Sequence, residues 1–471
     1  MVFEIARKEF LDLLRDGRLR WCGAIIAALL LAATLVGWRS WREVSAERAA
    51  AQTEANRHFD EQEEKNPHAA AHYGLYVFKQ KPSLSFLDPG VDPYTGVSIH
   101  LEAHRRNEAK DRPVRDSTAI QRFGELTAAV VLQVLLPLLV VFLVFPVIAA
   151  EREQGTLRLL MSLGVSPRSI VLGKLIGVTA ALGLIVVPAA ALGMLVLLAG
   201  GFHSERAWPH APILGVAYSL YLGMFVVVSM AVSARCKSSR HALIILMALW
   251  IMNTTIAPRF ATDLSRRLLP TPSSLEFQSS IGTELKAGID GHHVGDERLE
   301  RLKSELLAKH RVDTVEELPI NFEGVALQAS EDFGNEVHDR HRGRLEKTLG
   351  RQDTLRKALG ILFPTLAIRE LSMALAGTDN DHARDFADAA ESHRRKLVRE
   401  LNRDLEVNGA GLGFMYQAGP DLWRSMPRFR HRPQELPEIL TRQTLGWVSL
   451  VTWFAAGIVL LNGATHSMRV D

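Results

Sequence analysis

Cysteine is scarce in this 471-residue chain, which contains only Cys22 and Cys236. One lies in an apolar run and the other in a basic stretch, so the sequence excludes a disulfide-stapled secreted domain and a cysteine-based zinc site. An excess of positive charge is also lacking, because 55 lysines and arginines stand against 52 acidic residues. The resulting net charge of +3 argues against a protein that binds nucleic acid by charge.

Charged residues are absent from six long stretches, and these stretches define the fold class. At 1.5 Å per residue, a helix of about 20 apolar residues crosses a hydrocarbon core of about 30 Å. The stretches that are long enough, or nearly so, are 21–38, 126–150, 175–202, 211–234, 242–258 and 443–465. The sequence therefore predicts an all-α polytopic membrane protein with six transmembrane helices. The fifth stretch is short and ends in Asn253, Thr254 and Thr255, so a buried amphipathic helix is the alternative there.

Residues 1–20 precede the first predicted span and have a helical pattern of their own. Apolar residues such as Phe3, Phe10 and Leu13 recur at helical spacing, with charged residues on the opposite face. This pattern predicts an amphipathic helix on the membrane surface. A cleavable signal peptide ending near Val44-Ser45-Ala46 is the alternative, but the segment before the apolar run is longer than a usual signal-peptide start.

The basic residues in the short connecting segments predict the orientation. Segments 1–20, 151–174 and 235–241 together contain twelve lysines and arginines, whereas the short loop 203–210 contains one. By the positive-inside bias, both termini, including the tail 466–471, are expected in the cytoplasm of a multi-pass inner-membrane protein. The two long segments, 39–125 and 259–442, are then extracytoplasmic insertions.

The second insertion is large enough for a core of its own and is expected to be mainly helical. Helix-period runs lie at Glu297–Lys309, Glu317–Leu349 and Asp385–Leu405. Alternating strand patterns are scarce, which disfavours the alternative of a β-sandwich. Histidines gather in this insertion, as His292-His293 and as the pair formed by His338 and His341, but without the H-E-x-x-H arrangement of a zinc peptidase, so no metal site is expected.

The segment between the second and third predicted spans has the most distinctive pattern. Glu151 and Glu153 are predicted to open a helix whose N-terminal dipole favours acids, while Arg158 and Arg168 supply a basic rim. The stretch E-x-E-x-G-T-L, followed by a proline and by G-K, resembles the cytoplasmic loop of ABC-2 type permeases that touches the ATP-binding subunit. The residues that carry this resemblance, and thus the candidate ATPase-coupling residues, are Glu151, Glu153, Gly155, Thr156, Leu157, Arg158, Pro167, Arg168 and Lys174.

Motifs in the second insertion extend the resemblance over nearly the whole chain. They are similar to a subgroup of ABC-2 permeases with a long outer insertion before the last span. The motifs are Pro364-Thr365-Leu366-Ala367, the run from Leu371 to Asp379, the run from Phe386 to Glu391, and Asp421-Leu422-Trp423 through Pro427.

The resemblance implies a permease subunit that couples ATP hydrolysis in a separate subunit to transport. The expected substrate is a hydrophobic or amphipathic molecule that is exported. Alternatively, the energy of ATP hydrolysis is used to act on an extracytoplasmic partner protein. The implied partners are ATP-binding cassette subunits and a second permease, identical or sister, within the lipid membrane. This chain lacks G-x-x-x-x-G-K-[ST], so it is not expected to be an enzyme or to bind a cofactor, and ATP and Mg²⁺ are expected on the partner subunit.

Polar residues within the predicted spans are few, and the spans contain no Asp, Glu, Lys or Arg, which disfavours an ion-driven carrier. Hydrogen bonding between packed helices is the alternative to substrate contact for each of them. The candidates for a translocation path are Gln133, Thr179, Ser229, Asn253 and Thr254.

A membrane scaffold that transports nothing and docks partner proteins through its outer domains is the alternative function. Lack of an ATPase partner would favour it. An enzyme is disfavoured because no set of nucleophile, base and orienting group can be placed in the sequence.

Overall fold

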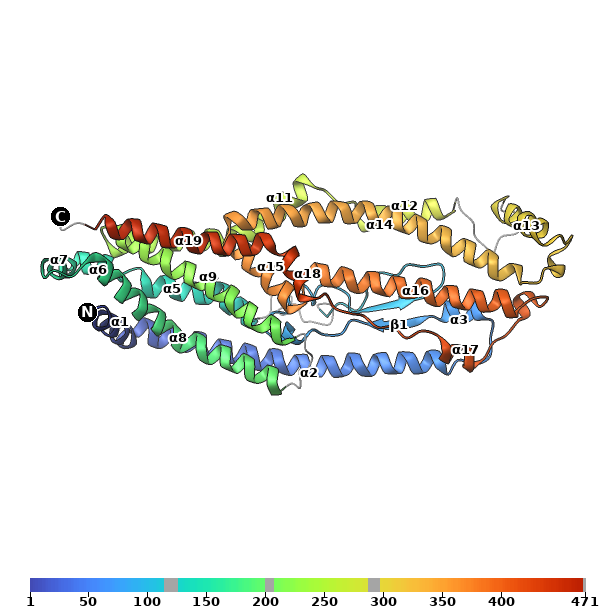
Figure 1. Ribbon diagram of the computed structural model, residues 1–471, viewed down its shortest axis with the longest axis horizontal. Coiled ribbons are helices and arrows are strands. Elements are labelled where there is room, and N and C mark those ends of the chain that lie inside the picture. Colours follow the sequence, from blue (N-terminus) through green and yellow to red (C-terminus); the bar gives the residue numbers. More distant parts are fainter. Residues whose placement is uncertain (114–125, 200–206, 287–296, 469–471) are drawn as a thin grey trace.

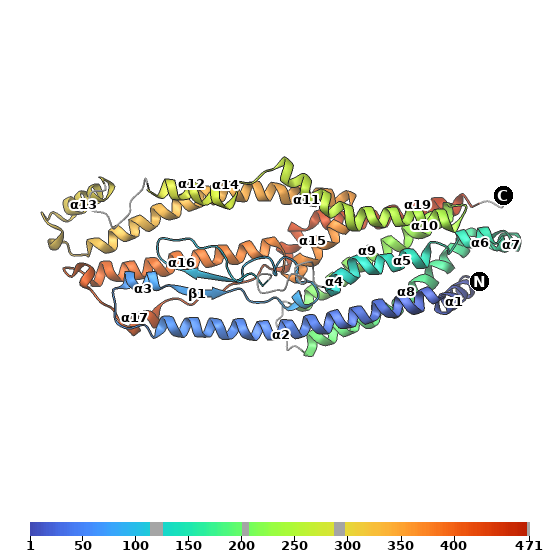
Figure 2. The same cartoon turned by 180° about the vertical axis from the view of Figure 1, so that it is seen from behind.

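The computed structural model describes residues 1–113, 126–199, 207–286 and 297–468, and helices predominate throughout them. One antiparallel pair of strands, β1 (Leu75–Phe78) and β2 (Ser98–Leu101), is present in these residues, with Leu75 opposite Leu101. The molecule is elongated, with α1, α6 and α7 at one end and α13 at the other (Figures 1 and 2). The prediction of an all-α polytopic membrane protein is confirmed.

Six helical segments of the described residues are long and apolar enough to cross a membrane, as the sequence predicts. They run over Leu19–Asp60, Ala128–Glu153, Pro167–Ala199, Trp208–Arg235, Ser239–Leu268 and Thr444–His466. Their principal helices are α2 (Ala24–Asp60), α4 (Ala128–Val130), α5 (Leu136–Val144), α6 (Ala149–Glu153), α8 (Pro167–Ala199), α9 (Ala207–Arg235), α10 (Ser239–Ile251), α11 (Ala257–Leu268) and α19 (Thr444–His466).

The remaining helices lie before, between and beyond these segments. They are α1 (Val2–Arg15), α3 (Pro67–Tyr73), α7 (Thr156–Ser162), α12 (Ser274–Lys286), α13 (Glu297–His310), α14 (Phe322–Leu362), α15 (Pro364–Ala376), α16 (Asn380–Asn408), α17 (Pro420–Ser425) and α18 (Leu436–Arg442). The mainly helical character predicted for the second insertion is therefore confirmed.

Several helices continue past the charge-free stretches. Helix α2 extends to Asp60 without a break, α8 begins at Pro167, and the fifth segment passes through a π-helical turn, Met252–Ile256, into α11. Only the apolar part of a helix can contact lipid. The backbone hydrogen bonds of the helix continue where the side chains become polar, because they do not depend on the side chains. Consequently Arg168 and Lys174 lie in the first turns of α8 rather than in a loop.

Close helix packing in the apolar bundle depends on small residues. Helix α9 packs against α19, where a Cβ on Gly457 would lie 2.5 Å from Val227 and one on Gly223 would lie 2.8 Å from Phe454. The predicted amphipathic helix is α1, and it packs along α8. There, Gly173 and Gly177 would each place a Cβ 2.7 Å from a side-chain carbon of α1. The spacing of these two glycines is the small-x-x-x-small pattern that lets helix backbones approach.

We use the term distal domain for residues 39–113, 269–286 and 297–442, which lie mostly beyond the apolar bundle in Figure 1. Helices α14 and α16 pack against each other, α16 also contacts α3, and α2 contacts β1. The core between them contains Phe59, Leu101, Phe386 and Trp423. Helix α15 is different, because Ile368 and Leu371 join the hydrophobic core of the apolar bundle.

A buried ionic cluster joins the two longest helices of the distal domain. The Arg394 guanidinium on α16 donates to Glu331 on α14 at 2.8 Å and to Glu391 at 2.8 Å. Burial alone would raise the pKa of each carboxyl, but hydrogen bonds and the charge of Arg394 outweigh it. The pKa of Glu331 is lowered to about 2, and that of Glu391 is also below its usual value.

This cluster makes the distal domain sensitive to acid. Because the pKa of both carboxyls is lower in the folded than in the unfolded protein, their stabilisation is complete above a pH of about 4.5. It is lost as the pH falls through the folded pKa values, of which that of Glu331 is about 2. We expect the melting temperature of the full-length protein in detergent to fall over that range, and less steeply in Glu391→Gln. Equal slopes for the two proteins would show that the cluster is not responsible.

Candidate functional site

Helices α6 and α7 form a short hairpin, which we call the α6–α7 hairpin, at the end of the molecule where the N-terminus and the end of α19 also lie (Figure 1). Gly155 reverses the chain between the two helices with φ +76°, and Gly164 follows α7 with φ +83°. L-residues with a Cβ rarely adopt these angles, so glycine is favoured at both bends.

Glu151 on α6 connects three helices. Its Oε1 lies 3.0 Å from Lys174 Nζ on α8, and the same Nζ lies 2.6 Å from Glu9 Oε2 on α1. Its Oε2 accepts a 2.5 Å hydrogen bond from Thr156 Oγ1 at the start of α7. Lys174 is only 4% exposed, so the ammonium is enclosed by these two carboxylates. Glu151 therefore fixes the hairpin to α1 and α8.

Glu153 and Arg152 fix the hairpin to the other side of the bundle. The Glu153 carboxylate accepts hydrogen bonds from Ser239 N at 3.0 Å and Ser239 Oγ at 2.7 Å, at the start of α10. Arg152 donates to the carbonyl oxygens of Cys236 and Ala234. The prediction that both acids open a helix is wrong for Glu153, which is the last residue of α6, because that helix begins at Ala149. Only Glu151 lies in its first turn.

The outward face of the hairpin exposes apolar side chains and one basic side chain. Leu159 and Leu163 are 58% and 71% exposed, and Arg158 is exposed beside them, whereas Leu157 points inward and is buried. We call Arg158, Leu159 and Leu163 the hairpin face. Arg158 is among the residues predicted from the motif, whereas Leu159 on α7 and Leu163 at its C-cap are not, although their spacing of four residues suits one face of a helix.

The other residues predicted for this region lie at the start of α8. Pro167 is the first residue of that helix, where its missing N–H costs nothing. Arg168 Nη2 lies 3.1 Å from His466 Nε2 at the end of α19. The basic rim predicted for Arg158 and Arg168 is therefore divided, because one faces outward and the other contacts the last helix.

The polar residues predicted in the spans occupy different environments. Gln133 Nε2 donates to Tyr218 OH at 2.9 Å, and Asn253 Oδ1 accepts from Thr365 N at 3.2 Å. Thr254 donates to a carbonyl of its own helix, Ser229 is buried in α9, and Thr179 on α8 is exposed. The structure does not bring these five residues together. Gln133 and Asn253 instead connect to α15, Gln133 through Tyr218 and Ser372, and Asn253 through Thr365.

A buried hydrogen-bond chain links the bundle to the distal domain, and we call it the junction network. From Gln133 it passes to Tyr218 OH, then to Ser372 Oγ on α15 at 2.9 Å, and from Ser372 to Asp88 Oδ2 at 2.5 Å. Tyr221 adds bonds to the Gln133 carbonyl and to Thr365 Oγ1. Burial raises the pKa of Asp88, although hydrogen bonds from Ser372 and the Gly90 N–H oppose this.

The sequence alone did not indicate that Tyr218, Ser372 and Asp88 are connected. Ser372 lies in a motif noted above, but Asp88 is more than 280 positions away in the other long segment, so only the fold reveals the contact. A buried polar network destabilises the fold unless every polar group in it is hydrogen-bonded. When it is satisfied, as here, it fixes the packing of α15 between the apolar bundle and the distal domain.

Taken together, six apolar helices, helix α1 docked on the third segment and a hairpin bonded to the bundle define an integral membrane protein. Residues 110–263 match the family model described as ABC-2 family transporter protein. Residues 274–432 match a model described only as a domain of unknown function, DUF3526. No curated protein gives a significant match.

The first match covers the second to fourth apolar segments, most of the fifth and the α6–α7 hairpin. It confirms the predicted resemblance to ABC-2 type permeases and supports a permease of an ABC transporter as the function. The second match falls within the segment predicted as the large insertion and includes α14, α15 and α16.

Proposed function

We propose that this chain is the membrane subunit of an ABC-2 transporter and that a separate ATP-binding subunit docks on the hairpin face. The observation that carries the proposal is the combination of a hairpin rigidly bonded to α1, α8 and α10 with two leucines exposed on its outer side. A rigid element tied to several membrane helices can pass on the movement of whatever binds it. Exposed apolar side chains beside a basic residue supply a surface for a partner.

In this proposal the polar residues of the hairpin motif bond within this chain and do not contact the partner. Glu151, Glu153, Thr156 and Lys174 hold the hairpin in place, and Gly155 sets its bend. The partner itself meets Arg158, Leu159 and Leu163. Movement then passes through α8, α10 and α9 to α15, and the junction network carries it to Asp88 in the distal domain.

The remaining assignments follow from the family and from charge. The ATPase subunits bind ATP and Mg²⁺, and this chain pairs with a second permease, identical or sister, in the inner membrane. Both termini and the hairpin face the cytoplasm, and the distal domain lies outside. The work done there is export of a hydrophobic or amphipathic substrate or action on an extracytoplasmic protein.

A double substitution of the hairpin face tests this proposal. We expect Leu159→Asp/Leu163→Asp to lower co-purification of the ATP-binding subunit by at least about tenfold, because charges replace the buried centre of an interface. Expression and melting temperature should stay near those of the wild type, since both side chains are already exposed. The measurement is the amount of ATPase retained per chain after affinity purification in mild detergent.

The matched control is Leu412→Asp, which changes a leucine of the distal domain that is 55% exposed. This variant should retain the ATPase fully. If the double variant also retains it, the hairpin face is not the docking surface.

A further inference from the structure

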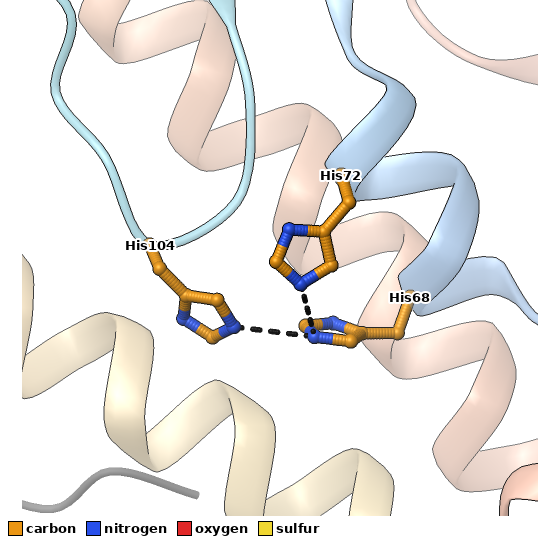
Figure 3. A group of neighbouring side chains, drawn as sticks. All are labelled: His68, His72 and His104. Carbon is orange, nitrogen blue, oxygen red and sulfur yellow. Dashed lines mark hydrogen bonds between the residues drawn. The ribbon is translucent and has the colours of Figure 1, made fainter. Parts of the chain in front are cut away.

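Three histidines converge in the distal domain, far from the hairpin and the junction network. His68 and His72 lie one turn apart on α3, and His104 lies in the turn just after β2 (Figure 3). Their rings point toward one another, with the Nε2 atoms innermost. His68 is buried, His104 is half-buried and His72 is exposed, so the group is open to solvent on one side.

The spacing of the nitrogens suits a small metal ion. His68 Nε2 lies 3.1 Å from His72 Nε2 and 3.2 Å from His104 Nε2, and the candidate ligand atoms all lie within 4.8 Å of one another. In a tetrahedral zinc site with Zn–N bonds of about 2.0–2.1 Å, two ligand nitrogens are separated by about 3.3–3.4 Å. The ring centroids, 4.6, 5.0 and 5.2 Å apart, form a nearly even triangle around a common point.

The positions of the protons on the rings also favour a bound metal ion, because hydrogen bonds among the three rings could not satisfy all three Nε2 atoms. His104 Nδ1 lies 3.1 Å from Glu331 Oε1, so in the neutral ring the Nδ1–H donates to that carboxylate. The Nε2 of His104 then presents a lone pair to His68. A single hydrogen on His68 Nε2 can serve only one neighbour, whereas a cation accepts lone pairs from all three nitrogens.

The chain holds the three rings in place before any ion binds. Asn66 caps α3 through the His68 N–H, and its own amide bonds to Phe414 O and Tyr416 O. His104 has φ +60°, an unusual conformation for a residue with a Cβ. Glu331 accepts from both the backbone N–H and the ring of His104, and Arg394 fixes Glu331 in turn. A carboxylate behind a ligating histidine is the usual device that orients the ring toward a metal.

We propose that His68, His72 and His104 bind one Zn²⁺ through their Nε2 atoms, with a solvent molecule as the fourth ligand on the exposed side of His72. Three imidazoles suit zinc and neighbouring transition ions, whereas Mg²⁺ and Ca²⁺ require oxygen ligands. Glu331 is a positioning residue. The ion would fasten α3 to the turn after β2 and, through Glu331, to α14. This site is independent of whether the chain couples to an ATPase.

The test uses the full-length protein in detergent, stripped of metal with a chelator and titrated with Zn²⁺ against a chromophoric competitor. We expect one Zn²⁺ per chain in the wild type. His72→Gln and His104→Gln should each weaken binding by at least about 100-fold, since loss of even an outer partner of a ligand costs about 10–100-fold. His72 is exposed, so His72→Gln should fold normally.

His58→Gln is the matched control, because His58 is an exposed histidine of α2 that pairs with Glu54 rather than with the cluster. It should bind Zn²⁺ like the wild type. Two further readouts are a rise in melting temperature on adding Zn²⁺ and the visible spectrum of bound Co²⁺, both absent in His72→Gln. Zn²⁺ affinities that are equal in the wild type and His72→Gln would overturn the proposal and leave a hydrogen-bonded histidine cluster.

Discussion

Lys174→Met should lower the free energy of unfolding by about 3–5 kcal/mol, the cost typical of removing one partner from a buried ionic group. Lys174 Nζ lies 2.6 Å from Glu9 and 3.0 Å from Glu151, and its side chain is only 4% exposed. The substitution leaves Glu9 and Glu151 facing each other where α1, α6 and α8 meet, with only the exposed Lys8 ammonium beside Glu151. We expect α1 to detach from α8 and the hairpin to lose its fixed position.

The measurement is thermal unfolding in detergent together with the rate at which a protease cleaves within α1. Lys8→Met is the matched control, because Lys8 also contacts Glu151, at 3.3 Å, but is 61% exposed. Surface pairs of this kind contribute about 0–1 kcal/mol, so this variant should melt close to the wild type. Equal melting temperatures for the two variants would show that the Lys174 cluster does not hold the helices together.

Arg394→Met should cost a similar amount, about 3–5 kcal/mol, but in the distal domain. The Arg394 side chain is 2% exposed and donates to Glu331, Glu391 and Asn335. Without it, two buried carboxylates face each other between α14 and α16. We expect these helices to separate locally while the apolar bundle stays folded.

Hydrogen exchange followed by mass spectrometry distinguishes that local effect from global unfolding. Amides of α14 and α16 should exchange faster in Arg394→Met, and those of α9 and α19 should be unchanged. Arg399→Met serves as the control on the same helix, since Arg399 is 61% exposed and lies 3.7 Å from Asp332. If the amides of α16 exchange no faster in Arg394→Met than in Arg399→Met, the cluster has no structural role.

The sequence predicts the membrane part of this fold well because absence of charge is a strong local signal. All six apolar segments were predicted, and residues 1–20 contain the expected helix, α1. Helix ends were predicted less well, since α2 continues to Asp60 although its second half is polar. The placement of α15 in the bundle core was missed, because its residues resemble any amphipathic helix of a distal domain.

Contacts between distant segments explain most of what the sequence could not show. The link from Ser372 to Asp88 and the approach of His104 to α3 both depend on how the two long segments pack. Part of the histidine cluster was nevertheless visible, since His68 and His72 have i, i+4 spacing just after Asn66-Pro67, a good helix start. Of the histidines considered from sequence, His292 and His293 lie outside the described residues, and His341 pairs with Glu284.

Purification of the full-length protein from its own membrane in mild detergent, with mass spectrometry of bound proteins and an ATPase assay, tests the central claim most directly. The proposal predicts an ATP-binding cassette subunit in stoichiometric amount, ATPase activity in the complex, and loss of both in Leu159→Asp/Leu163→Asp. A folded preparation that contains no ATP-binding subunit and shows no ATPase activity would contradict the claim. That result would favour a membrane scaffold whose distal domain docks partner proteins.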